Sequence, residues 1–103
     1  MKTTILLGLA TTLLSFSALA DKCSEAELLD AVDHYESEIS PYEGGKYNHV
    51  VKEVKEPREE GNDKVYEVHI GYEGYLDGYR NLEFRAKKSD TQCIFQVYLL
   101  DEV

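Results

Sequence analysis

Three patterns of apolar residues follow one another along this chain. A nearly continuous apolar run fills most of residues 1–20, apolar positions at three- and four-residue steps fill most of 24–40, and alternating apolar and polar positions recur after that. Steps of three and four indicate a helix with one buried face, and a period of two indicates a strand with one buried face. The order therefore predicts one helix followed by several strands.

The helix has a clear start and a clear end in the sequence. Ser24 and Glu27 have the spacing of a capping box, in which each side chain binds a backbone N–H of the first turn. Pro41 and the two glycines after Glu43 end the pattern. We expect a helix from Ser24 to Ser40. Its apolar stripe contains Leu28, Leu29, Val32, Tyr35 and Ile39, and its exposed face contains Glu25, Glu27, Asp30, Asp33, Glu36 and Glu38.

Four strands are predicted after the helix. They are Tyr47 to Glu56, Lys64 to Tyr72, Tyr79 to Lys88, and Gln92 to Leu100. Short polar turns separate them, so they should pair in sequence order as an antiparallel meander. The first strand has two competing registers, because its apolar residues favour both faces, and a β-bulge would reconcile them.

The N-terminal segment has the pattern of a secretory signal peptide. Lys2 precedes an apolar run from Ile5 to Leu14, and Ala18-Leu19-Ala20 places small residues before a cleavage site. We expect cleavage after Ala20, which leaves residues 21–103 as a single small α+β domain. The protein should then be periplasmic or secreted, without membrane insertion after signal cleavage.

Two cysteines, Cys23 and Cys93, remain after this cleavage. An even number in a small exported domain predicts one disulfide. This bond would turn Cys93 toward the side of the sheet that the helix covers. Phe95, Val97 and Leu99 would then face inward, and Ile94, Gln96, Tyr98 and Leu100 would face outward.

This order of elements resembles the cystatin fold, in which a long N-terminal helix packs on an antiparallel meander. The resemblance is one of element order and length. The family's inhibitory hairpin has the motif Gln-x-Val-x-Gly, whereas the matching turn here runs from Pro57 to Gly61 and shares only the glycine. The chain also lacks the tryptophan of the family's second contact turn. None of the family's contact residues therefore has an equivalent in this sequence.

Charge excludes one class of partner. Residues 21–103 contain ten basic and twenty acidic side chains, which gives a net charge of −10. Such a surface repels phosphate backbones, so we expect no nucleic-acid binding. We expect no cofactor and no enzyme activity, because the sequence lacks a nucleophile elbow and a phosphate-binding glycine loop. Asp30 and His34 lie one helical turn apart, but two ligands do not make a metal site.

Two surfaces remain as candidates for binding. Tyr75 and Tyr79 flank a tight glycine-containing turn, and tyrosine suits recognition because it combines apolar area with a polar tip. The sheet face away from the helix is the second. It should contain Val65, His69, Tyr79, Arg85, Lys87, Ile94, Tyr98 and Leu100.

The sequence thus predicts a small exported protein-binding module, in which a hydrolase or a second copy of the chain is the partner. The expected contact residues are Tyr75, Tyr79, Ile94 and Tyr98, together with Glu59, Glu60 and Asp63 as an acidic hairpin tip. The alternative is a periplasmic binding protein for a small ligand or a divalent cation, held by the acidic helix, the tyrosine turn or a gap between helix and sheet.

Overall fold

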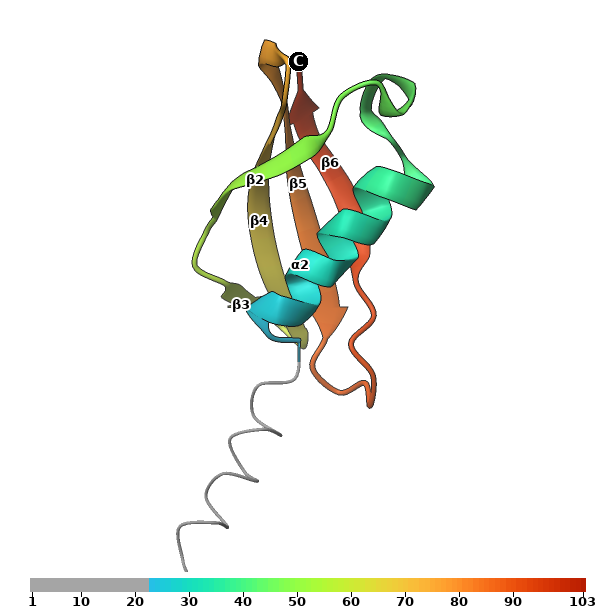
Figure 1. The fold of residues 1–103 in the computed structure, drawn as a ribbon. Helices are drawn as coiled ribbons and strands as arrows, with labels where there is room; N and C mark the ends of the chain where they lie inside the picture. The colour runs from blue at the N-terminus through green and yellow to red at the C-terminus, as the bar shows by residue number, and fades with distance from the viewer. Residues whose placement is uncertain (1–22) are drawn as a thin grey trace, which may run out of the picture.

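The computed structural model describes residues 23–103. The predicted signal peptide, residues 1–20, lies outside this range. Within it, helix α2 lies across one face of an antiparallel sheet, at an angle to the strands (Figure 1). This confirms an α+β fold of one helix and one antiparallel sheet.

Helix α2 spans Glu25–His34 and begins as the sequence predicts. Ser24 is the N-cap, and its side-chain oxygen accepts a hydrogen bond from the backbone N–H of Glu27. The α-helical turns end six residues before the predicted end. A π-helical segment, η1 (Tyr35–Ile39), continues the helix, and a short 3-10 helix, η2 (Tyr42–Gly45), follows Pro41. The wider π turn changes which side of the helix each later residue faces.

The sheet contains five strands rather than four. They are β2 (His49–Val54), β3 (Arg58–Glu60), β4 (Asp63–Tyr72), β5 (Tyr75–Lys87) and β6 (Gln96–Glu102). The spatial order is β2-β4-β5-β6, and β3 pairs with the same edge of β4 as β2 does. The additional strand β3 occupies part of the segment predicted as a polar turn.

The last two strands, β5 and β6, have boundaries that differ from the predicted ones. β5 starts at Tyr75 because Glu73 and Gly74 alone turn the chain, and Gly74 has the positive φ that a tight turn needs. β6 starts four residues later than predicted and ends at Glu102. Its pairing skips Leu100, which forms a bulge opposite β5, so Leu100 does not continue the outward alternation.

The ambiguous register of the first strand is resolved by a bulge. Val51 pairs with Ile70 and Val54 pairs with Val68, and the extra residue lies between Val51 and Glu53. Both valines therefore pack against the core from the same side of the sheet. The structure thus contains the bulge that would reconcile the two registers.

The core lies between α2 and the sheet. It is formed by Leu28 and Val32 of the helix with Tyr42, Tyr66, Val68, Ile70, Tyr72, Leu82 and Phe84. Phe95 and Val97 pack against it, as predicted from the disulfide, whereas Leu99, predicted to face inward with them, is 49% exposed. Leu29 and Ile39 differ from the prediction, because both belong to the predicted apolar stripe but are exposed.

Candidate functional site

A groove runs between α2 and the segment that leads into β6. It has a volume of about 670 Å³ and is lined from the helical side by Glu27, Asp30, Ala31, His34, Tyr35 and Ile39, and from the other side by Cys93, Phe95 and Val97. Two of its lining residues are aromatic. Tyr35 and Phe95 pack edge-on against the buried Phe84 beneath them, at centroid distances of 6.2 and 6.0 Å. The groove is therefore an opening onto the core itself.

The groove is open at its rim because the helical segment packs unevenly against the sheet: Ala31 and Tyr35 still touch the core, but the rim residue Ile39 does not. Leu28 and Val32 are fully buried, whereas Ile39, at the groove's rim, is 60% exposed. Sequence periodicity missed this difference, since a stripe of apolar residues does not reveal which part of it lacks a partner.

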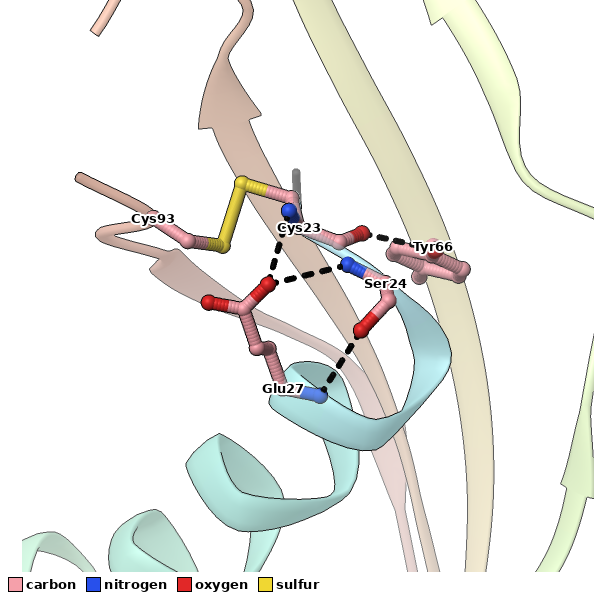
Figure 2. The surroundings of a disulfide bond; sticks show 5 residues. All are labelled: Cys23, Ser24, Glu27, Tyr66 and Cys93. Atoms are coloured by element: carbon pink, nitrogen blue, oxygen red, sulfur yellow. Dashed lines mark hydrogen bonds between the residues drawn. A yellow bond between two sulfur atoms is a disulfide. The ribbon is translucent and has the colours of Figure 1, made fainter. Parts of the chain in front are cut away.

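The disulfide lies at the lining of the groove, and Figure 2 shows it beside the start of α2 with Ser24, Glu27 and Tyr66 around it. Cys93 lines the groove, and its bond to Cys23 fixes the chain before β6 to the helix start. Cys23 has φ of 61°, a conformation that non-glycine residues rarely adopt. Two further contacts hold it there: Tyr66 donates a hydrogen bond to its carbonyl at 2.9 Å, and the Glu27 carboxylate accepts from its N–H at 3.0 Å. This part of the groove lining is consequently rigid.

Strand β6 forms the terminal edge of the sheet beside the groove. Among the described strands it pairs only with β5, so its other edge has unpaired backbone groups. Residues 96–100 are Gln, Val, Tyr, Leu and Leu, without a charge or a proline. Ile94 is 61% exposed and Tyr98 is 47% exposed, as the sequence predicted for both residues. The Tyr98 hydroxyl donates to the Gln96 side chain at 3.0 Å.

The helical wall of the groove is acidic. Residues 24–45 contain no lysine or arginine. Glu27 and Asp30 line the groove, and His34 is the only lining residue with a basic side chain. Elsewhere in the described chain most cations already have a carboxylate partner. Six of the nine lysines and arginines form ion pairs, namely Lys55, Arg58, Arg80, Arg85, Lys87 and Lys88. The negative charge at the groove is therefore not balanced nearby.

The opposite face of the sheet carries charged side chains over β3, β4 and β5, while Ile94, Tyr98 and Leu100, which the sequence predicted there, are exposed. Arg58 reaches over it and contacts Glu60, Glu67 and Glu83 at 2.6, 2.7 and 3.0 Å. Arg85 contacts Glu60 and Glu83 at 2.8 and 3.0 Å. Val65, expected on this exposed surface, is fully buried.

The predicted acidic tip is part of this ion-pair network. Glu59 pairs with Lys88 at 2.9 Å, and Asp63 pairs with Arg85 at 3.0 Å. The hydrogen bond from Lys88 lowers the pKa of Glu59. Hydrogen bonds from Arg85 and Lys87 lower the pKa of Asp63 in the same way. Each of these carboxylates thus has a cation partner within the chain.

The tyrosine turn lies at the far end of the sheet, away from the disulfide. Tyr75 and Tyr79 line a smaller hollow of about 350 Å³, together with Lys52, His69, Gly71, Tyr72, Leu76, Asp77 and Gly78. Tyr79 donates a hydrogen bond to Asp101 at 3.2 Å, and this bond raises the pKa of the tyrosine. Tyr75 packs against Tyr47 at a centroid distance of 5.3 Å. Ile94 and Tyr98 line neither this hollow nor the groove, so the structure separates the predicted contacts into two regions.

A buried polar cluster was missed by the sequence prediction. Glu36, expected on the exposed helix face, is buried and accepts a hydrogen bond from the Tyr72 hydroxyl at 2.6 Å. Arg80 pairs with the other oxygen of Glu36 at 3.1 Å and donates to the Ser40 carbonyl at 2.6 Å. Burial, followed by the hydrogen bond to Glu36, raises the pKa of Tyr72. Arg80 and Leu82 are two residues apart on β5, so their side chains face the same, inward side of the sheet. This alternation was the one feature of the sequence that could have indicated the burial of Arg80.

Metal ligands do not converge in the described part of the chain. Among residues 23–103, no three side chains of histidine, cysteine, aspartate or glutamate are arranged so that they could hold a metal ion together. Asp30 and His34 both line the groove, but His49 instead contacts Asp33 at 3.2 Å. Within the same range, none of the helices has the length and apolar character needed to span a membrane.

Comparison of this chain with protein-family models, with curated proteins and with solved structures found no match.

Proposed function

We propose that this protein is a small exported, non-enzymatic module that binds another protein through β6 and the adjoining groove. The observation that supports it best is the coincidence of two open features, an apolar groove and an uncharged strand edge. Soluble proteins normally protect an edge strand with charges, prolines or a covering element. Exposed apolar surface of this kind commonly marks a protein contact.

Tyr98 and Ile94 are the proposed anchors on the sheet face away from the groove, where they would contact the outward side chains of the same partner. Both are exposed and neither lines the groove; Tyr98 pairs with Glu83, which points away from α2. Large side chains at the centre of an interface contribute most of its binding energy, while the surrounding residues exclude water. Tyr75, Tyr79 and the ion-paired carboxylates Glu59, Glu60 and Asp63 belong to a second, more distant contact in this proposal.

Export is part of the proposal. The pattern of residues 1–20 is that of a signal peptide, and a disulfide is typical of oxidising compartments such as the periplasm or the extracellular space. The helix-on-sheet plan supports a cystatin-like classification. That resemblance would make a hydrolase the partner, although through contacts other than the family's inhibitory motifs, which this sequence lacks.

Affinity capture with matched variants tests the proposal. The mature protein, Tyr98→Asp, Ile39→Asp and the control Leu29→Asp would each be immobilised and exposed to extract from the exporting cell's envelope. Leu29 is an exposed leucine of α2 that lines neither the groove nor the hollow at the tyrosine turn, so it reports on the general effect of a new charge. We expect a partner retained by the wild type and the control but lost by the other two variants, all folded by circular dichroism. Equal retention by all four proteins would contradict the proposal.

Binding of a small ligand is the second candidate. The groove's volume falls in the range of about 300–1,000 Å³ that small-molecule sites occupy. Its apolar floor with a few polar groups at the rim also fits such a site. Native mass spectrometry of the purified protein would show a bound compound as added mass, and calorimetry with calcium, zinc and copper would detect a cation at Asp30 and His34.

A further inference from the structure

We propose that the groove and the β6 edge together accept one kind of partner: an extended segment with alternating apolar side chains and flanking lysine or arginine residues. The segment would add a strand to the sheet beside β6. This inference rests on the proposed protein-binding function and specifies the chemistry of its partner.

The open edge of β6 determines the backbone conformation of the partner, which must be an extended strand. Alternate N–H and C=O groups of an edge strand point away from the sheet and are available to a further strand. An added strand lies about 4.8 Å from its neighbour, so it would lie directly beside β6. Main-chain pairing of this type gives affinity without requiring a particular sequence.

The apolar positions of the partner are defined by the groove. Every second side chain of an added strand points to the helical side of the sheet. Phe95 and Val97 of this chain point to that side, and the space between them and α2 is open. Apolar side chains from an added strand would fill it and would cover Ile39, which is now 60% exposed.

Charge complementarity decides between possible occupants. Glu27 and Asp30 line the groove, and no lysine or arginine lies between residues 24 and 45. Residues 23–103 together have nine basic and nineteen acidic side chains, so a second copy would bring a net charge of −10 toward an acidic wall. A basic segment is attracted by the same wall. We therefore assign the groove to a basic partner rather than to self-association.

Three synthetic peptides test this assignment. The first is Lys-Thr-Val-Thr-Val-Thr-Val-Thr-Lys, in which lysines and valines share one face of a strand, the second replaces both lysines by glutamate, and the third replaces the central valine by proline. Proline cannot donate to a strand ladder, so the third peptide keeps the charge but loses strand pairing. Each would be labelled and titrated with the intact disulfide-bonded protein, with binding measured by fluorescence anisotropy.

We expect the lysine peptide to bind, and the glutamate and proline peptides to bind at least about tenfold more weakly. Raising the salt concentration from about 0.05 to 0.3 M should weaken the lysine peptide, because the Debye length shortens. Equal binding of the lysine and glutamate peptides would overturn the assignment of charge. Equal binding of the proline peptide would overturn strand addition.

Two pairs of matched variants locate the site. Ile39→Gln should weaken binding about fivefold, whereas Leu76→Gln, at an exposed leucine outside the groove, should not. Asp30→Lys should weaken it, whereas Glu53→Lys, the same charge change on the opposite edge strand β2, should weaken it much less. Equal losses within either pair would overturn the location.

Analytical ultracentrifugation of the protein without peptide tests the other possible occupant of the groove, a second copy of this chain. A dimer that Ile39→Gln dissociates would assign the groove to a second copy and overturn the basic partner. If none of the three peptides binds but the protein still captures a natural partner through the groove, this inference is overturned and the proposed function stands. If neither peptide binding nor groove-dependent capture is observed, both the inference and the proposed function are overturned.

Discussion

The two edges of the sheet are built differently. One edge of β4 is shared by two short strands, β2 and β3, and β2 has a bulge and two charged residues, Lys52 and Glu53. The other edge strand, β6, pairs only with β5 among the described strands; its bulge at Leu100 and its two charged residues lie at its end, and residues 96–100 before them are uncharged. Charges and bulges in the middle of an edge strand resist pairing with other chains, whereas a run of uncharged edge residues leaves the edge open to it. The comparison locates the proposed interaction at β6.

The same asymmetry appears in the helix. Its packed flank places Leu28 and Val32 in the core, and its open flank leaves Ile39 and Asp30 at the rim of the groove. Packing thus supplies stability at one side of the molecule and accessible surface at the other. Changes at the first side should cost folding free energy, and changes at the second should leave it nearly unchanged.

Removing the disulfide should have the largest effect. Cys23→Ser with Cys93→Ser opens a loop with a sequence separation of 70 residues, and the chain-entropy model assigns about 4 kcal/mol of unfolding free energy to such a loop. Urea unfolding would measure the loss. Because the bond holds the entry of β6 against the helix, hydrogen exchange should increase more in β6 than in β2. Equal increases at both edges would contradict the comparison.

Truncation on the two helix flanks should give unequal losses. Leu28→Ala removes a fully buried side chain and should cost about 3 kcal/mol through lost burial and a new cavity. Ile39→Ala removes a mostly exposed side chain and should cost about 1 kcal/mol or less. Urea unfolding of both variants gives the ratio directly. Similar losses would mean that the groove flank is packed as tightly as the core flank.

Acid should weaken the ion-paired face. Hydrogen bonds from Arg58 and Arg85 lower the pKa of Glu60 below 4.5, and those from Arg85 and Lys87 lower the pKa of Asp63 below 3.8. These carboxylates stabilise the fold above their unfolded pKa values, and the contribution is lost as pH falls through the lower folded values. The urea concentration at the unfolding midpoint should therefore decrease as the pH is lowered below about 4.

Arg85→Met is the matched variant for the acid prediction. It removes the hydrogen bonds that Arg85 makes to both carboxylates, so its urea midpoint should change less between pH 7 and pH 3 than that of the wild type. An unchanged pH dependence would show that the network on this face contributes little to acid sensitivity.

Much of the fold could be predicted from the sequence because local patterns determine it. The capping box fixed the helix start at Ser24, alternation gave the central strands, and the two cysteines oriented Phe95 and Val97. The bulge in β2 followed from two conflicting sets of valines. The cap, the alternation and the valines are local patterns, whereas the two cysteines lie 70 residues apart and were informative because an even number in a small exported domain predicts a pair.

The groove and the polar networks could not be predicted in the same way. How far a helix lies across a sheet depends on side-chain volumes from several strands, and periodicity contains no such information. The pairing of Arg58 with Glu67 and Glu83 joins three strands. The burial of Glu36 depends on a π-helical segment and on Arg80, 44 residues away. These contacts are long-range products of packing.

Chemical-shift mapping of the isotope-labelled protein tests the central claim most directly. During titration with the lysine peptide, shifts should be confined to β6, to Cys93 and Phe95, and to the groove-facing residues of α2 and η1 such as Ala31 and Ile39. Shifts centred on β2, or on Arg58 and Arg85 of the opposite face, would contradict the account.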